Sequence, residues 1–189
     1  ARAHMPSLVV VSNPECQPAL ASALADLPIK VEAGAKALVD AASAPVDLVV
    51  MGIVGFAALG PSLAAVRYAD AVALANKECL VVSGALLMET AARHETCLLP
   101  VDSEHNGVFQ LLEGRDADTL SKIVLTASGG PFREMALDDM AQVTPEMAVA
   151  HPNWTMGAKI SVDSATMMNK GLELIAVSYT HLRAHETEE

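Results

Sequence analysis

Aromatic residues are scarce in this sequence of 189 residues, and their scarcity limits how a core can be built. Only 3% of the residues are Phe, Trp or Tyr, although 52% are hydrophobic. The chain is long enough to bury the core of one or two domains. That core must therefore consist of Ala, Val, Leu, Ile and Met side chains.

Cysteine and positively charged residues are also scarce. The three cysteines, Cys16, Cys79 and Cys97, are too few and too scattered for a disulfide framework or a zinc cluster, and they suit a reducing cytosol. The net charge of −11 argues against a broad surface for nucleic acid or anionic membranes, but it permits a local basic phosphate pocket. No membrane span and no secretory signal are expected.

The first part of the chain alternates between apolar runs and helical patterns. We expect buried strands at residues 8–12 and 47–53 and a third strand at 71–75. The helices expected between them cover residues 18–25, 36–42 and 60–66. Alternation of this kind predicts an α/β fold with a parallel sheet.

The second part of the chain has longer helices and more polar loops. Its expected strands are 96–101, 122–127 and 159–162. Three helices are expected at 77–92, 106–113 and 137–143. A further helix should start at Thr144-Pro145-Glu146, and a final one should be capped by Ser164. The segment HPNWTMG, residues 151–157, is expected to be a loop.

The stretch LPVDSEHNGVF, residues 99–109, permits two interpretations. A strand that ends here would point Asp102 and Glu104 to one side, where two carboxylates can form a site for a hard cation. Alternatively, Ser103 caps the following helix, with acidic residues favoured at its positive end. Both interpretations stay open at this point.

Polar residues follow other predicted strands as well, at Ser128-Gly129-Gly130 and Asp163-Ser164. Ligands of α/β proteins bind at such strand ends. The final helix places Asn169 and Glu173 on one face, and Lys170 with Glu173 alone would be an ordinary surface ion pair. Asp102, Glu104 and Glu173 together would suit Mg²⁺ or Mn²⁺. The donors Ser103, Ser128, Ser164, Asn169 and Lys170 would suit a phosphate or a polyol.

The loop at residues 151–157 contains Trp154, the single tryptophan of the chain. In one interpretation this side chain is buried in the core beneath a surface loop. In the other, the loop is a lid that closes an apolar side chain over a ligand and excludes water. The sequence supports the two equally.

Five segments together resemble the 1-deoxy-D-xylulose 5-phosphate reductoisomerase family. They are ALANKE (73–78), PVDSEHN (100–106), LTASGGPF (125–132), HPNWTMG (151–157) and KISVDSATMMNKGLE (159–173), and MGIVGFAALGPSLAAVR (51–67) is similar to the family's cofactor domain. The resemblance implies an NADPH-dependent enzyme that rearranges and reduces 1-deoxy-D-xylulose 5-phosphate to 2-C-methyl-D-erythritol 4-phosphate, on the methylerythritol phosphate route to isoprenoids. It further implies a cytoplasmic location in bacteria or a plastid location in plants, and a homodimer for the full-length enzyme.

The resemblance also implies roles for individual residues. Asp102, Glu104 and Glu173 would hold Mg²⁺ or Mn²⁺. Lys77, His151 and the three metal ligands would be the catalytic residues. Substrate would contact Lys77, Ser103, Glu104, Ser128, His151, Trp154, Ser164, Asn169, Lys170 and Glu173, with Trp154 on a mobile flap. NADPH would contact Asn76, Glu78 and Gly157.

Compared with the family that it resembles, the chain shows neither the N-terminal Gly-rich cofactor loop nor the C-terminal helical domain. It has no Gly-rich phosphate loop of the family's type, so we expect an incomplete Rossmann-like parallel-sheet domain at residues 1–75, the later part of the NADPH-binding domain. An α/β catalytic domain, itself partial, is expected at 76–175, and residues 176–189 are expected to be a non-family tail, read as an artefact of sequencing.

Other functions stay open beside the leading hypothesis. One is a fragment of the enzyme that binds metal and phosphate without turnover. Another is a different nicotinamide-dependent sugar-phosphate oxidoreductase, against which the order of the five motifs argues. A module that binds a partner protein is disfavoured because the matched polar positions are all retained.

Overall fold

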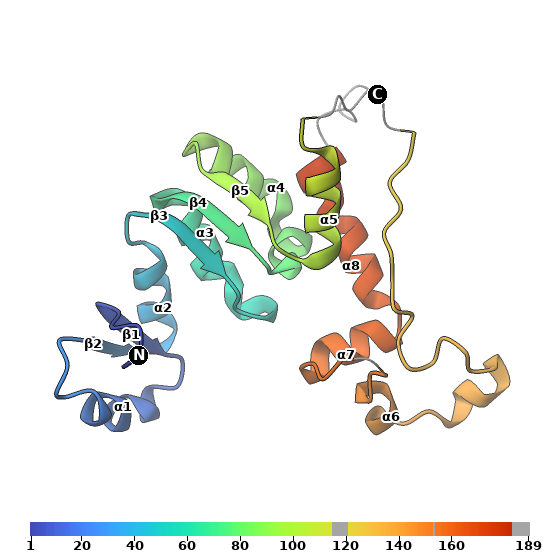
Figure 1. Ribbon diagram of the computed structural model, residues 1–189, viewed down its shortest axis with the longest axis horizontal. Coiled ribbons are helices and arrows are strands. Elements are labelled where there is room, and N and C mark those ends of the chain that lie inside the picture. Colours follow the sequence, from blue (N-terminus) through green and yellow to red (C-terminus); the bar gives the residue numbers. More distant parts are fainter. Residues whose placement is uncertain (115–120, 153, 183–189) are drawn as a thin grey trace. The chain divides into compact units, whose positions relative to one another are not determined.

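A computed structural model of the protein describes residues 1–114, 121–152 and 154–182 (Figure 1). The chain divides into two compact units, which are considered separately. The first comprises Ala1–Cys79 and Ala85–Leu99, and the second comprises Leu80–Gly84 and the described residues from Pro100 onward. The domain boundary that the sequence suggested after residue 75 stays a prediction.

The first unit is a mixed α/β structure with parallel strands. Its elements are β1 (Leu8–Val11), α1 (Gln17–Ala23), β2 (Lys30–Ala33), α2 (Gly34–Ala42), β3 (Val46–Met51), α3 (Leu59–Tyr68), β4 (Ala69–Leu74), most of α4 (Lys77–Arg93) and most of β5 (Cys97–Pro100). Short 3₁₀ turns, Pro14–Cys16 and Gly55–Ala58, precede α1 and α3. The predicted α/β class with parallel strands is confirmed.

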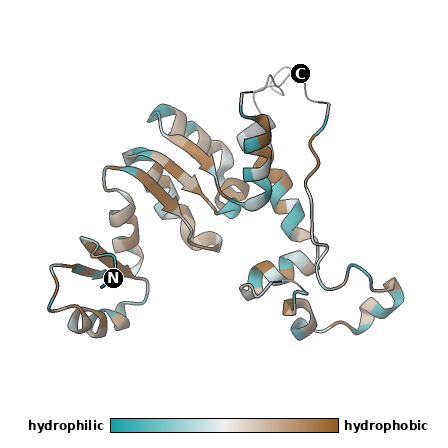
Figure 2. Ribbon diagram, in the orientation of Figure 1, coloured by the Kyte–Doolittle hydropathy of each residue, from teal (hydrophilic) through white to brown (hydrophobic). Residues whose placement is uncertain are grey.

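The strands form two sheets. β1 pairs in parallel with β2, and a three-stranded sheet has the order β3-β4-β5, in which β3 and β4 run parallel with Val46 opposite Ala69. In Figure 2 the strands of the second sheet are largely brown, as expected of Val- and Leu-rich segments. Thr96 donates its hydroxyl to the carbonyl of Val66 at 2.8 Å, which joins the start of β5 to α3.

Small aliphatic side chains fill the core of this unit, as the composition predicted. Ala58, Ala65, Val66, Val72 and Leu87 are each fully buried. Among the described residues, no aromatic side chain is part of the buried hydrophobic core. Helices can therefore approach the sheet closely, because most core side chains extend only one or two carbons from the backbone.

Two expectations for the first unit were wrong, and one strand was not predicted. The strand predicted at 47–53 as buried is β3, and Leu48 and Val50 are 50% and 69% exposed because β3 is the edge strand of its sheet. The strand predicted at 8–12 is half-buried, since its sheet has only two strands. Strand β2 was not predicted, because Lys30 and Glu32 interrupt its apolar pattern within four residues.

The second unit is mainly helical among its described residues. It contains α5 (Ser103–Leu112), a 3₁₀ turn at Leu137–Gln142, α6 (Pro145–Val149), α7 (Ala158–Ala165), α8 (Met168–Val177) and a π-helical turn at Ser178–Leu182. Thr144 caps α6 by accepting a hydrogen bond from the backbone N–H of Met147, as predicted. No helix in the described part of the chain has the length and apolar character that crossing a membrane requires.

Two predicted strands of this unit are not strands. Residues 122–127 are extended but pair with no described strand, and Val124 is 70% exposed. Residues 159–162 belong to helix α7, where Lys159 pairs with Asp163 one turn later at 2.6 Å. An ion pair at this spacing is compatible with a helix and contributes about 0.2–0.5 kcal/mol to it.

The end of α7 also differs from expectation. Ser164 does not cap the final helix, because it lies inside α7. Helix α8 instead follows Met167, whose backbone is left-handed with φ 62°. The part of the predicted tail beyond Leu182 lies outside the described residues. Just before it, Tyr179 packs so closely on Gly84 that a Cβ there would lie 2.5 Å from the ring.

The three cysteines provide a test of this packing. Cys16 and Cys97 are exposed, whereas Cys79 is 1% exposed, and burial raises the pKa of its thiol. We therefore expect iodoacetamide to alkylate Cys16 and Cys97 in the native chain while Cys79 reacts far more slowly. Peptide mass spectrometry would measure the three rates, and all three should react in urea. Native alkylation of Cys79 as fast as Cys16 would contradict this core.

Candidate metal and phosphate site

The turn between β5 and α5 presents two of the predicted metal ligands. Asp102 occupies the N-cap position of α5 without a side-chain capping bond, and Glu104 lies in the first turn. Asn106 fixes the turn: its side-chain amide donates to the carbonyl of Pro100 at 2.9 Å, and its backbone N–H donates to the carbonyl of Asp102 at 2.8 Å. Ser103 is the first residue of the helix and not its cap, so the capping interpretation of Ser103 is wrong.

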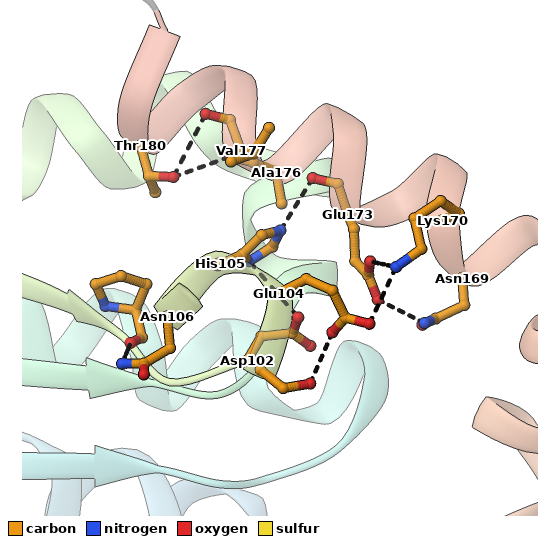
Figure 3. Close-up of polar contacts among 12 residues, drawn as sticks. Asp102, Glu104, His105, Asn106, Asn169, Lys170, Glu173, Ala176, Val177 and Thr180 are labelled. Carbon is orange, nitrogen blue, oxygen red and sulfur yellow. Dashed lines mark hydrogen bonds and ion pairs between the residues drawn. The ribbon is translucent and has the colours of Figure 1, made fainter. Parts of the chain in front are cut away.

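Helix α8 brings the third carboxylate to this turn. Asn169 and Lys170 lie one helical turn before Glu173, and the three side chains are on the face that points toward α5 (Figure 3). One side-chain oxygen each from Asp102, Glu104 and Glu173 lies within 4.8 Å of the others. The three carboxylates predicted from distant segments are thus brought together.

His105 connects the two helices that carry these carboxylates. Its Nε2 lies 2.9 Å from the backbone carbonyl of Glu173, and since a carbonyl only accepts, Nε2 donates the hydrogen bond. Its Nδ1 lies 3.9 Å from Oδ1 of Asp102. The side chain is buried, so this contact holds α8 against the start of α5. The sequence reasoning missed His105, although its position three residues after Asp102 in a turn of polar residues was a signal.

Two carboxylates of the cluster, Glu104 and Glu173, have hydrogen-bond donors around them. Glu173 is fully buried, and it accepts from the amide of Asn169 at 2.5 Å and contacts the ammonium of Lys170. Glu104 accepts from the hydroxyl of Ser103 at 2.7 Å and from Lys170 at 3.0 Å. Lys170 and Glu173 are therefore not the ordinary surface pair that the sequence alone favoured.

Opposing effects act on the pKa of Glu104. Partial burial raises it, but the hydrogen bonds from Ser103 and Lys170 and the charge on Lys170 outweigh burial, so that the pKa of Glu104 lies below its usual value. Glu104 is consequently ionised at neutral pH.

This donor set fits a hard divalent cation. Mg²⁺ and Mn²⁺ prefer oxygen ligands such as carboxylates, and they leave other coordination positions for water or substrate. The carbonyl oxygen of the Asn169 side chain is also buried, with no hydrogen-bond partner among the described residues. An oxygen-rich cluster with such an unpaired acceptor next to it is suited to a cation.

A second group of predicted residues gathers around Ser128. Its hydroxyl lies 3.0 Å from Nε2 of His151 and 3.3 Å from the hydroxyl of Ser164. The backbone of Gly130 has φ +67°, and a Cβ there would lie 2.7 Å from the carbonyl oxygen of Ser164. The glycine thus permits a close approach of the Ser128 loop to α7.

Trp154 lies next to this second group. It stacks on His151 with ring centroids 5.0 Å apart, and its backbone N–H donates to Nδ1 of the same histidine at 3.2 Å. The side chain is 59% exposed, so the interpretation in which it is buried in the core is wrong. Gly157, the predicted cofactor contact, is the N-cap of α7. The lid stays a prediction.

The remaining predicted residues lie at the start of α4, in the first unit. Asn76 caps this helix by accepting from the N–H of Cys79 at 2.8 Å, and its amide donates to the carbonyls of Ile53 and Gly55. Asn76 and Lys77 are buried, and Glu78 lies in the first helical turn. Asn76 therefore has a structural role in the turn after β4, and its contact with a cofactor stays a prediction.

Comparisons with known proteins agree on one family. Residues 1–84 match the family described as 1-deoxy-D-xylulose 5-phosphate reductoisomerase, and residues 98–181 match the C-terminal domain of the same enzyme. The chain is 50% identical to the 1-deoxy-D-xylulose 5-phosphate reductoisomerase of Bacteroides fragilis over 95% of its own length and 46% of that protein. It is 54% identical to the Zymomonas mobilis enzyme over 88% of its length and 43% of that protein.

Solved structures of the same enzyme have the same fold. The Zymomonas mobilis reductoisomerase in complex with NADPH is 48% identical, with a TM-score of 0.83 over 92% of this chain and 45% of that one. A DOX-P reductoisomerase in complex with NADPH, fosmidomycin and magnesium is 40% identical, with a TM-score of 0.85 over 95% of this chain and 47% of that one. The chain thus spans about half the length of the relatives that it matches.

The contact of His105 with α8 yields a prediction for stability. His105→Ala leaves the buried carbonyl of Glu173 without this donor, so we expect the free energy of unfolding to fall by about 1–3 kcal/mol. Urea denaturation followed by circular dichroism would measure it. The control is His94→Ala, at an exposed position after α4, which should stay within about 0.5 kcal/mol of the natural chain. Equal effects of the two substitutions would show that His105 does not hold the helices together.

Proposed function

The chain belongs to the 1-deoxy-D-xylulose 5-phosphate reductoisomerase family, and on that premise we propose that its activity is the family's NADPH- and metal-dependent reaction. In that reaction 1-deoxy-D-xylulose 5-phosphate is isomerised and reduced to 2-C-methyl-D-erythritol 4-phosphate, a precursor of isoprenoids. The membership that five sequence motifs predicted is confirmed. The chain spans 46% of the length of the Bacteroides fragilis enzyme.

One observation carries the proposal, namely the convergence of Asp102, Glu104 and Glu173. We propose that these carboxylates hold Mg²⁺ or Mn²⁺, in keeping with the magnesium of the solved DOX-P reductoisomerase complex. A metal ion bound there would polarise the substrate carbonyl and stabilise negative charge that develops on its oxygen.

The other residues would bind and orient the substrate. Ser128, His151 and Ser164 form one hydrogen-bonded group whose hydroxyl and imidazole donors suit phosphate or hydroxyl oxygens. Ser103, Asn169 and Lys170 surround the carboxylates with further donors. The proposal assigns substrate contacts to these six residues and to Lys77, and cofactor contacts to Asn76, Glu78 and Gly157. Trp154 would close over the substrate and exclude water.

The metal site leads to a direct binding experiment. Glu173→Gln removes one anionic ligand, so the affinity for Mn²⁺ should fall by about tenfold or more. Isothermal titration of the metal-free chain would measure this, with circular dichroism to verify folding. Asp139→Asn is the matched control, because it removes an exposed carboxylate outside the cluster. The metal assignment fails if the two variants bind Mn²⁺ equally well.

The lid leads to a fluorescence experiment. Trp154 is the only tryptophan and is 59% exposed, so its emission reports on one site. Fosmidomycin added with Mg²⁺ should move the indole to a drier environment and shift its emission to shorter wavelength. Trp154→Phe should remove the signal while calorimetry still detects metal-dependent binding. A shift of the same size in the presence of EDTA would contradict a lid that closes over a metal-bound ligand.

The alternative is that the chain binds metal and sugar phosphate without turnover. Oxidation of NADPH in the presence of Mg²⁺ and 1-deoxy-D-xylulose 5-phosphate distinguishes the two. Turnover supports the full reaction, and metal-dependent substrate binding without oxidation supports the alternative.

A further inference from the structure

The ammonium of Lys170 lies among the carboxylates that the proposed function assigns to a metal ion. Its Nζ is 3.0 Å from Oε1 of Glu104 and in contact with Oε2 of Glu173 (Figure 3). It therefore bridges α8 to the first turn of α5 through a cationic group.

Charge explains why a cation is held at this place. Glu173 is fully buried, and an ionised carboxylate removed from water requires compensation. Asn169 and Ser103 contribute neutral donors to the cluster, whereas Lys170 contributes a full positive charge. Lys170 thus supplies the kind of charge that a metal ion would otherwise supply.

An ammonium and a metal ion bound at this cluster would share the same carboxylates. Hydrogen bonds from Nζ use lone pairs of Glu104 and Glu173, and these lone pairs are then not available to a metal. Two positive charges a few ångströms apart also repel each other. We propose that Lys170 is an internal counter-ion of the carboxylates, an inference that rests on the proposed metal site. Lys170 neutralises the carboxylates until a divalent cation displaces its ammonium. The displaced ammonium then binds an anionic group of the substrate.

The surroundings of Lys170 permit such a movement. Its side chain is 18% exposed and that of Glu104 is 21% exposed, whereas Glu173 lies fully inside. Lys170 is therefore on the solvent side of Glu173. Its stem of four methylene groups can swing outward by side-chain rotation while the backbone of α8 stays in place. Binding of the metal ion would thereby come first, and it would release Lys170 for the binding of an anion.

Two measurements on the 189-residue chain test this proposal. Lys170→Met removes the competing charge and keeps an unbranched side chain, so calorimetry should show Mn²⁺ bound about tenfold more tightly than by the natural chain. Lys170→Arg keeps the charge and should bind Mn²⁺ no more tightly than the natural chain. Lys159→Met is the matched control, because Lys159 pairs with Asp163 at an exposed site on α7.

The second measurement uses the natural chain and needs no variant to fold. Reductive methylation followed by peptide mass spectrometry should modify Lys170 slowly in EDTA and severalfold faster with saturating Mg²⁺, while the rate for Lys159 stays constant. An unchanged rate for Lys170, or an affinity of Lys170→Met that does not exceed that of the natural chain, would overturn the role of Lys170 and leave the metal site intact. Absence of Mn²⁺ binding by the natural chain and by Lys170→Met would overturn the metal site itself.

Discussion

A carboxylate that is completely removed from water is the constraint on which the site depends. Glu173 is fully buried on α8, and its charge requires donors that the surrounding chain has to bring to it. Asn169 and Lys170, from the preceding helical turn, donate hydrogen bonds to it. Lys170 also donates to Glu104 on α5. His105 binds the backbone of the same glutamate. The polar contacts between α5 and α8 thus gather around one buried residue.

The sequence predicted the members of this cluster better than the backbone around them. Asn169 and Glu173 are four residues apart, and helical spacing alone places them on one face. Asp102 and Glu104 follow an apolar strand, as the sequence suggested. The convergence of these two segments could be inferred only from the family resemblance, because no local pattern encodes a contact between residues some 70 positions apart.

The errors in the fold have a common physical origin. Segments 122–127 and 159–162 have the side chains of strands, but a strand exists only when a neighbouring strand accepts its hydrogen bonds. Residues 159–162 instead form helix α7, stabilised by the pair of Lys159 and Asp163. Likewise, the exposure of Val50 depends on the place of β3 at a sheet edge, which its own sequence does not contain. Tertiary context decides such segments.

The close approach at Gly130 limits which side chains this chain can tolerate in the course of evolution. With φ +67° and a would-be Cβ 2.7 Å from the carbonyl oxygen of Ser164, even alanine at this position would be strained in its backbone and would force a shift of α7 or of the Ser128 loop. One added methyl group would act as a spacer between the Ser128 loop and α7, and would separate two hydroxyls that now lie 3.3 Å apart. The absence of a side chain at Gly130 therefore matters for function, because it lets Ser128 and Ser164 lie this close together.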